Sequence, residues 1–298
     1  MKPIAWPLIG HDVAEQKFLQ AASSGKLHHA WLIEGVSGIG KSRFANRIAA
    51  YMLGAKLVDS NSLDVDRDDP IIKKIEAEAH PDLRWIKRSP DEKGKVKQDI
   101  PVDDVRSLNH FFSLRAALDG WRIGIIDSLD ELNRNGSNAM LKTLEEPPQK
   151  CLLLLISHGT KEILPTIRSR CRMLRLSALE EHQTLDALKL ADVEDPRSIA
   201  KLSRGRPGYG LSLSGQSGVL AANAARSWLR ALPKPLDAAT SQAIGTAGVD
   251  TISFEAFSSE LLGWLSDRST QHYECAKSWL AATLMSVSYT HLTLPTKA

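Results

Sequence analysis

A glycine-rich octapeptide, GVSGIGKS, contains the residue types that hold phosphate groups in nucleotide-binding proteins. It matches G-x-x-x-x-G-K-[ST] at every fixed position and lies between a predicted strand and a predicted helix, which is the context that the motif requires. Glycines let successive backbone N–H groups turn toward phosphate oxygens, and the start of the helix adds positive potential. The sequence therefore predicts a nucleotide site formed by Gly35, Val36, Ser37, Gly38, Ile39, Gly40, Lys41 and Ser42.

Three side chains have distinct expected roles at this site. In proteins with this loop the lysine reaches the β and γ phosphates and the hydroxyl residue holds Mg²⁺, so we assign these roles to Lys41 and Ser42. Asp127 ends an apolar run, RIGIID, and its carboxylate suits a place next to the Mg²⁺ ion that Ser42 would hold. The expected ligand is ATP with Mg²⁺, bound either for function in the cell or only as a structural element.

The residue after Asp127 argues against hydrolysis. ATPases of this kind usually carry a glutamate there to activate water, but this chain has Ser128, whose hydroxyl is neither basic enough nor long enough for that task. Asp130 and Glu131 follow in a loop or helix, and we expect them to point elsewhere. The sequence predicts a site that binds ATP and is poorly equipped to cleave it.

Short apolar runs alternate with helical periods in the part of the chain that must position these residues. Apolar runs with little alternation are typical of strands in a parallel sheet that is covered on both faces. The expected strands are AWLIE at 30–34, LRWIK at 83–87, IGIID at 123–127, CLLLLIS at 151–157 and MLRL at 173–176. Between them, Phe44, Ile48 and Tyr51 share one helix face, and this helix should end at Gly54. We therefore predict an α/β domain with helices on both faces of the sheet.

The second part of the chain is predicted to be helical. Asp195 and Pro196 are typical of a helix cap and a first helical residue. Phe254, Phe257 and, further on, Leu261 and Leu265 have the spacing of an apolar helix face, which we expect to lie in the core or at a partner interface. The predicted divisions are a nucleotide-binding domain at 1–177, a small helical domain at 178–217, an incomplete helical domain at 218–286 and a non-native tail at 287–298.

Composition and charge narrow the class of protein. A chain of 298 residues with 43% hydrophobic and 24% charged residues is typical of globular proteins with more than one domain. A net charge of +3 is small for a protein that binds nucleic acid without the help of other proteins. We therefore expect any DNA contact to be shared with partner proteins. The amino-terminus lacks the apolar core of a signal peptide, and we expect a cytoplasmic location. The cysteines Cys151, Cys171 and Cys275 lack C-x-x-C spacing, so we expect no zinc site.

The chain resembles the clamp-loader branch of the AAA+ ATPases in three segments, HHAWLIEGVSGIGKS, IIDSLDELNRNGSNAMLKTLEEPP and LPTIRSRC. The resemblance is strong from about residue 5 to residue 215, and LKTLEEPP and SRC are specific to the bacterial clamp loaders. It implies a RecA-like AAA+ P-loop domain, then a small helical lid and an all-helical collar domain that joins the subunits in a pentameric ring.

The resemblance also implies partners and a role at a neighbouring subunit. The partners would be the other clamp-loader subunits (gamma/tau and delta), the sliding clamp and, through the assembled complex, primer-template DNA. Arg170 of SRC would be an arginine finger, whose guanidinium stabilises the charge on the γ phosphate at the neighbour's site. Arg168 is the rival for this role, and the alternative for Arg170 is a surface ion pair.

Two departures separate this chain from the motor subunits of the family. Motors carry Asp-Glu where this chain has Asp127-Ser128, and they carry a sensor arginine where the segment GRPGYGL places Gly208. Arg206 lies two positions too early to replace it. The resemblance therefore favours a stator subunit that binds nucleotide weakly or structurally. The alternative is an active gamma/tau-like motor in which Asp130 or Glu131 replaces the glutamate.

Overall fold

The computed structural model describes residues 8–59, 61–66, 68–90, 94, 96–118, 120–214, 216–232 and 251–269. The chain divides into two compact units, with the boundary between Thr184 and Leu185. The elements of the first unit are α1 (Asp12–Ser23), β1 (Ala30–Glu34), α2 (Lys41–Met52), α3 (Pro70–Glu76), β2 (Leu83–Lys87), α4 (Val102–Ser113), β3 (Arg122–Asp127), the 3-10 helix η1 (Leu129–Glu131), α5 (Arg134–Glu145), β4 (Cys151–Ser157), α6 (Pro165–Arg168) and β5 (Arg172–Arg175). Helix α7 (Glu181–Lys189) crosses the boundary, and the second unit continues with α8 (Pro196–Ser203), α9 (Pro207–Leu213), α10 (Gln216–Ala231) and α12 (Thr251–Ser269).

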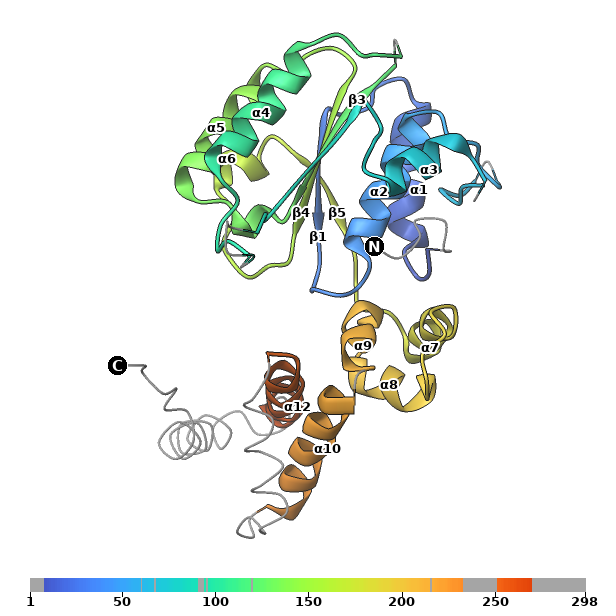
Figure 1. Ribbon diagram of the computed structural model, residues 1–298, viewed down its shortest axis with the longest axis vertical. Helices are drawn as coiled ribbons and strands as arrows, with labels where there is room; N and C mark the ends of the chain where they lie inside the picture. Colours follow the sequence, from blue (N-terminus) through green and yellow to red (C-terminus); the bar gives the residue numbers. More distant parts are fainter. Residues whose placement is uncertain are drawn as a thin grey trace. The chain divides into compact units, whose positions relative to one another are not determined.

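A parallel sheet with the strand order β2-β3-β4-β1-β5 forms the centre of the first unit (Figure 1). The five predicted strands are confirmed, although β3 begins at Arg122 and β5 at Arg172, one residue earlier than expected. Strand β4 pairs with both β3 and β1, so the order of the strands in the sheet changes direction between β4 and β1. Ligands of open α/β sheets bind outside the carboxyl ends of the strands, where such a change of direction brings several loops together. The loops after β1, β3 and β4 meet at that edge.

Helices cover both faces of the sheet, which explains why its strands are apolar with little alternation. All seven residues of β4 are buried. Helices α1, α2 and α3 pack on one face through residues such as Phe18, Phe44 and Ile72. Helices α4, α5 and α6 pack on the other face, where Leu108 and Met140 lie in the core. The predicted RecA-like α/β architecture is therefore confirmed.

Helix α2 begins directly after the glycine-rich loop, and its sequence explains both ends. Its cap, Gly40, has a φ of 102°, a left-handed conformation that costs glycine little. Phe44 and Ile48 are fully buried on one face of α2. Gly54 has a φ of 88° just after the helix, as expected for a terminating glycine.

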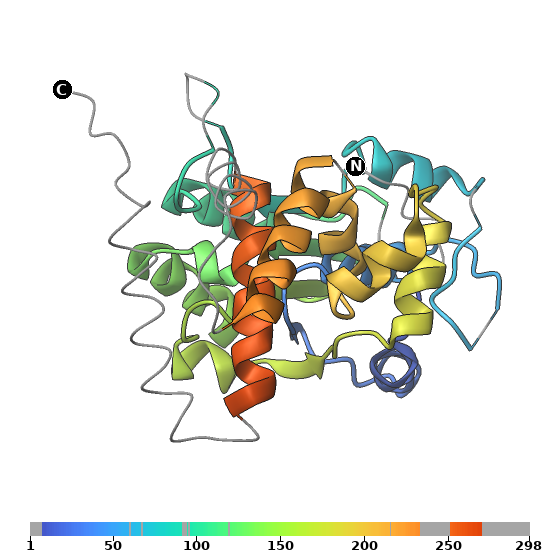
Figure 2. The same ribbon diagram turned by 90° about the horizontal axis from the view of Figure 1, so that it is seen from below.

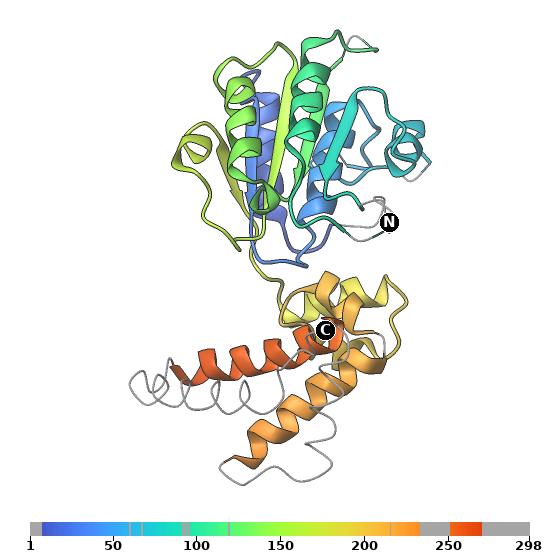
Figure 3. The same cartoon turned by 60° about the vertical axis from the view of Figure 1, so that its left-hand side comes forward.

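Small apolar clusters hold the second unit together. Leu188 of α7 and Ile199 of α8 belong to one cluster. Trp228 of α10 stacks on Phe257 of α12 with the ring centroids 6.1 Å apart, and Figures 2 and 3 show these two helices side by side. The side chain of Asp195 accepts a hydrogen bond from the backbone N–H of Ser198 at the start of α8, as its predicted role as a cap requires.

The predicted apolar face of α12 is only partly buried within this chain. Phe257 is buried, but Phe254 is 45% exposed. The buried side contains Glu260 instead, whose two carboxylate oxygens accept hydrogen bonds from Arg226 of α10 at 2.7 and 3.3 Å. Contact with α10, and not the apolar spacing alone, therefore sets which side of α12 is buried.

The predicted domain divisions at residues 177 and 217 remain predictions. The structure separates its two compact units within α7, between these two positions. Of the segment predicted as an incomplete helical domain, only 218–232 and 251–269 are described, and the tail predicted at 287–298 lies outside the described residues. No helix in the described part of the chain is long and apolar enough to cross a membrane.

Candidate nucleotide site

The loop GVSGIGKS connects β1 to α2 at the carboxyl edge of the sheet. A Cβ atom on Gly35 would lie 2.4 Å from the first carbonyl oxygen after β5, so a larger residue does not fit there. Ile39 is 2% exposed and anchors the loop in the core. Val36 and Ser37 at the tip of the loop are exposed. Gly38 then turns with a φ of 86°. The loop is thus fixed at both ends and open at its tip.

Lys41 lies over this loop with its ammonium group bound to the loop's own carbonyl groups. Its Nζ donates hydrogen bonds to the carbonyl oxygens of Gly35 and Val36, both at 2.6 Å. Burial lowers the pKa of Lys41 to about 8, although the charges of Asp127 and Asp130 oppose this shift. A bound phosphate would supply negative charge and raise that pKa again. The lysine therefore fits a polyphosphate ligand.

Ser42 and Asp127 come together as the motif requires. The Oγ of Ser42 donates a hydrogen bond to Asp127 Oδ2 at 2.6 Å. The other carboxylate oxygen of Asp127 lies 3.7 Å from Nε2 of His158. Mg²⁺ prefers oxygen ligands and is usually held by one or two protein groups together with substrate phosphates. These two side chains fit such an ion, with Ser42 as a ligand and Asp127 beside it.

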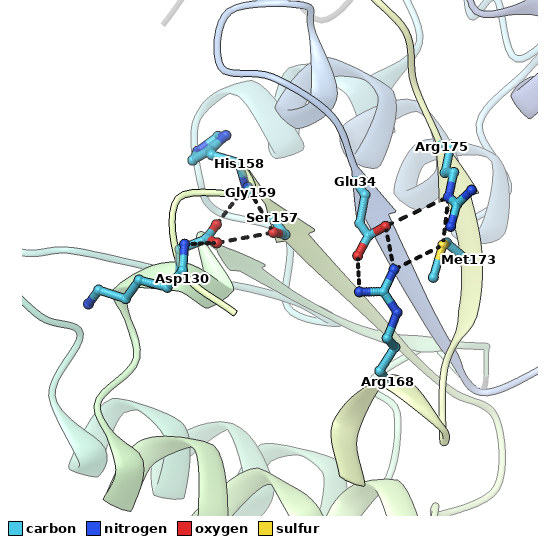
Figure 4. Close-up of polar contacts among 9 residues, drawn as sticks. Glu34, Asp130, Ser157, His158, Gly159, Arg168, Met173 and Arg175 are labelled. Carbon is cyan, nitrogen blue, oxygen red and sulfur yellow. Dashed lines mark hydrogen bonds and ion pairs between the residues drawn. The ribbon is translucent and has the colours of Figure 1, made fainter. Parts of the chain in front are cut away.

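Asp130 is fully engaged with the loop that follows β4 (Figure 4). It accepts hydrogen bonds from Ser157 Oγ at 3.1 Å, from the backbone N–H of His158 at 2.6 Å and from that of Lys161 at 3.3 Å. The residue is 4% exposed. As expected, Asp130 binds groups other than the nucleotide loop, and its role is to fix the end of β4.

Glu131 and Ser128 complete the surroundings of Asp127. Glu131 forms an ion pair with Arg88, with 2.9 Å between Arg88 Nε and Glu131 Oε2. Burial raises the pKa of Glu131, and Arg88 opposes this shift. Ser128 is 1% exposed, and its Oγ makes no hydrogen bond with any described residue. The position after Asp127 therefore offers a buried hydroxyl, and the next two acids are bound elsewhere.

We expect Asp130→Asn to lower the free energy of unfolding by about 2–3 kcal/mol, because hydrogen bonds to a buried carboxylate are strong and an amide replaces one acceptor with a donor. Urea denaturation measures this change. The control is Asp99→Asn, since Asp99 is partly exposed and lies 3.7 Å from Lys161, and we expect that variant to lose less than about 1 kcal/mol. Unchanged stability together with lower ATP hydrolysis would instead identify Asp130 as the missing base.

Two histidines at the site were not predicted from the sequence. His11 is 5% exposed, and its Nε2 lies 2.8 Å from the carbonyl oxygen of Ile39. Burial lowers the pKa of His11. Burial and then the charge of Lys41 lower the pKa of His158. Only the place of His158 at the carboxyl end of a strand could have indicated it, and no sequence pattern marks His11.

The two arginines of the segment RSRC bind different carboxylates. Arg170 lies 2.9 Å from Glu145 Oε1 through Nη2 and donates from Nη1 to the carbonyl oxygen of Thr166, also at 2.9 Å. Arg168 binds Glu34 at the end of β1 (Figure 4). The surface ion pair considered for Arg170 is therefore present in this chain. A role at a neighbouring site requires Arg170 to exchange Glu145 for a phosphate.

In the second unit, Gly208 and Arg206 lie at the start of α9. Arg206 Nη2 donates a hydrogen bond to Ser259 Oγ at 2.8 Å, and its guanidinium lies 4.3 Å from the ring centre of Tyr209. Arg206 is thus engaged within this unit. Among the residues that the structure describes, no group of three His, Cys, Asp or Glu side chains could hold a metal ion. Cys275 lies outside them, and the absence of zinc remains a prediction.

A comparison of the sequence with family models identifies one family. A family model described as "DNA polymerase III, delta subunit" matches residues 10–180. The chain is 33% identical over 192 residues to the DNA polymerase III subunit delta' of Pseudomonas aeruginosa, which covers 63% of this chain and 56% of that protein. It is 32% identical over 182 residues to a DNA polymerase III subunit gamma of Buchnera aphidicola, covering 61% and 47%. The chain thus spans about half the length of these relatives. A solved gamma subunit-related protein of Thermotoga maritima aligns over 81% of this chain and 76% of its own with 19% identity and a TM-score of 0.46.

Proposed function

This chain belongs to the DNA polymerase III delta-subunit family, and we propose that it is a clamp-loader stator of the delta-prime type. It binds ATP with Mg²⁺ weakly or structurally, and hydrolyses little or none of it. It supplies Arg170 to the ATP site of an adjacent motor subunit. Through this contact it takes part in placing a sliding clamp on primed DNA.

The observation that carries this proposal is that the acidic residues after Asp127 are bound to groups other than the nucleotide site. Ser42 and Asp127 are in contact, so the parts that bind phosphate and metal are assembled. The next position is Ser128, and Asp130 and Glu131 are held by other groups. Transfer of a γ phosphate to water needs a residue that positions or activates the water. The site supports binding of ATP better than its cleavage.

The role of Arg170 is supported by its position on the turn between α6 and β5. Its partner Glu145 is 50% exposed, and Arg170 itself is 36% exposed. A surface ion pair of this kind contributes less than about 1 kcal/mol, so its exchange for a phosphate costs little. A guanidinium offers several fixed donors to a phosphate, which suits the transition state of phosphoryl transfer.

A gamma/tau-like motor is the second candidate, and Glu131 is the observation that favours it. Burial raises the pKa of this carboxyl group, and a raised pKa suits a general base. The similarity to a subunit named gamma agrees with this alternative. The ion pair with Arg88 would have to break first.

The proposed partners follow from the family. The chain would assemble with gamma/tau motor subunits and a delta subunit, act on the sliding clamp and reach primer-template DNA only through the complex. We propose a cytoplasmic location for this assembly. Purifying the complex from its own cell and identifying its subunits by mass spectrometry tests these partners.

The isolated chain should bind ATP and show no steady-state hydrolysis above background, because Ser128 cannot activate water. A phosphate-release assay with the pure monomer measures this, and Glu131→Gln is the informative variant. Clear hydrolysis by the unaltered chain that Glu131→Gln removes would replace the stator proposal with the motor alternative. Equal background rates for both proteins are expected.

A further inference from the structure

Glu34 is the last residue of β1 and directly precedes the phosphate loop. Its carboxylate binds Arg168 through two contacts, Nη1 to Oε1 at 3.1 Å and Nη2 to Oε2 at 3.2 Å. Nε of Arg175 lies 3.9 Å from the same Oε2. Figure 4 shows Arg168 reaching from α6 to Glu34, with Arg175 on another side of the carboxylate. Glu34 is 19% exposed and Arg168 44%, so the pair is partly shielded from water.

The pair borders a cavity of about 530 Å³ that also touches the phosphate loop. Gly35 and Val36 of the loop form one wall, and His158 after β4 lies beside them. Arg168 and Arg175 belong to the lining of the same space. The phosphate loop and Arg168 therefore face the same cavity.

Backbone contacts connect Glu34 to the end of β5, and connect Arg168 to the turn that carries Arg170. The carbonyl oxygen of Glu34 accepts a hydrogen bond from the N–H of Leu176 at 2.8 Å. Arg168 ends α6, and the N–H of Arg170, two residues later, donates to the carbonyl oxygen of Ile167 at 3.1 Å. Arg168 and Arg170 thus lie on one short turn, which is held by Glu34 at the phosphate loop and by Glu145 at the end of α5.

We propose that Glu34, acting through Arg168, is a positioning residue that makes the placement of Arg170 depend on the nucleotide state of the chain's own phosphate loop. This inference rests on the function proposed above. A bound nucleotide would add negative charge at the loop that begins directly after Glu34, and this charge would compete with Glu34 for Arg168. Release of Arg168 loosens the turn, and Arg170 can then leave Glu145 for the neighbouring site.

The test uses clamp loaders assembled with motor and delta subunits and measures ATP hydrolysis with clamp and primed DNA. Lys41→Ala, which empties this chain's own site, should lower turnover by about two- to fivefold, the range expected for a partly exposed ion pair. Glu34→Gln alone should stay within about twofold of the unaltered loader. The double variant, Lys41→Ala with Glu34→Gln, should recover to the turnover of Glu34→Gln. In this variant the Glu34–Arg168 contact, through which an empty loop would hold Arg170 back, is absent. Glu162→Gln, which removes another carboxylate from the same cavity lining, should give no such recovery.

Binding to the isolated chain provides a second readout without hydrolysis. Coupling between two equilibria is reciprocal, so Glu34→Gln should tighten ATP binding by about the same two- to fivefold. Glu162→Gln controls for the simple loss of one negative charge near the loop and should leave the affinity within the error of titration calorimetry. Equal tightening by both variants would mean general electrostatics and would overturn the proposal.

Other outcomes separate this inference from the proposed function. If Lys41→Ala leaves loader turnover unchanged, or if the double variant stays as low as Lys41→Ala, the coupling does not exist. The proposed function survives either result as long as Arg170→Ala still lowers turnover. Arg168→Gln removes the same contact from the other side and should also restore turnover in the Lys41→Ala loader. Failure of both Glu34→Gln and Arg168→Gln to assemble would show that the pair is purely structural.

Discussion

We expect Arg170→Ala to lower ATP hydrolysis by the assembled clamp loader and to leave the isolated chain's own ATP affinity unchanged. An arginine finger contributes roughly 10³–10⁵ in rate at the site that it serves in GTPases. Arg170 would serve one site of several, so total turnover should fall by about the share of that site. The fall in turnover is larger if the subunits hydrolyse ATP one after another. Steady-state phosphate release with clamp and primed DNA measures the effect.

The controls for Arg170→Ala lie on the same short segment. Arg172 is exposed at the start of β5, and Arg172→Ala should leave turnover unchanged. Loss of the Arg170–Glu145 pair should change the unfolding free energy by less than about 1 kcal/mol, so a fall in turnover does not arise from unfolding. If Arg168→Ala is the damaging variant instead, the finger is Arg168. If neither variant lowers turnover, the subunit does not act on a neighbour's site.

The central sheet and the phosphate loop could be predicted from the sequence because their signals are local. The central strands β1, β3 and β4 are almost continuous apolar runs, since helices cover both faces of the sheet. The glycines and the lysine of the loop have fixed spacing, and the contact of Ser42 with Asp127 follows from strands that end at one edge. The sequence could not tell which apolar residues are buried within the chain where contact with another helix determines this. Phe254 is exposed because α12 turns another side toward α10.

The partners of the charged residues could not be predicted for the same reason. Glu34 and Arg168 are 134 positions apart, and only the adjacency of β1 and β5 brings them together. The spacing of acids after Asp127 indicated that Asp130 points elsewhere, but it did not indicate that Asp130 binds the loop after β4. Side-chain pairs across strands depend on strand order, which apolar patterns do not encode.

The second large effect is expected for Lys41→Ala, which should weaken ATP binding to the isolated chain by about a hundredfold or more. Hydrogen bonds to charged groups contribute roughly 1.5–3 kcal/mol each, and every 1.4 kcal/mol is about a factor of ten. Titration calorimetry in the presence of Mg²⁺ measures the affinity. Lys26→Ala is the control, because this exposed lysine precedes β1 at the opposite end of the strand from the loop, and its affinity should not change.

The pH dependence of binding distinguishes a charge effect of Lys41 from a change in loop shape. Burial lowers the pKa of Lys41 to about 8 in the free protein, while bound phosphate favours the charged ammonium group and raises the pKa. ATP affinity should therefore be highest below pH 8 and fall as the pH rises past it, by up to about tenfold per unit. Lys41→Ala should remove this fall between pH 8 and 9. An affinity that is flat in both proteins would mean that Lys41 does not contact the phosphates, and no detectable binding by the unaltered chain would mean that the loop has lost its ligand.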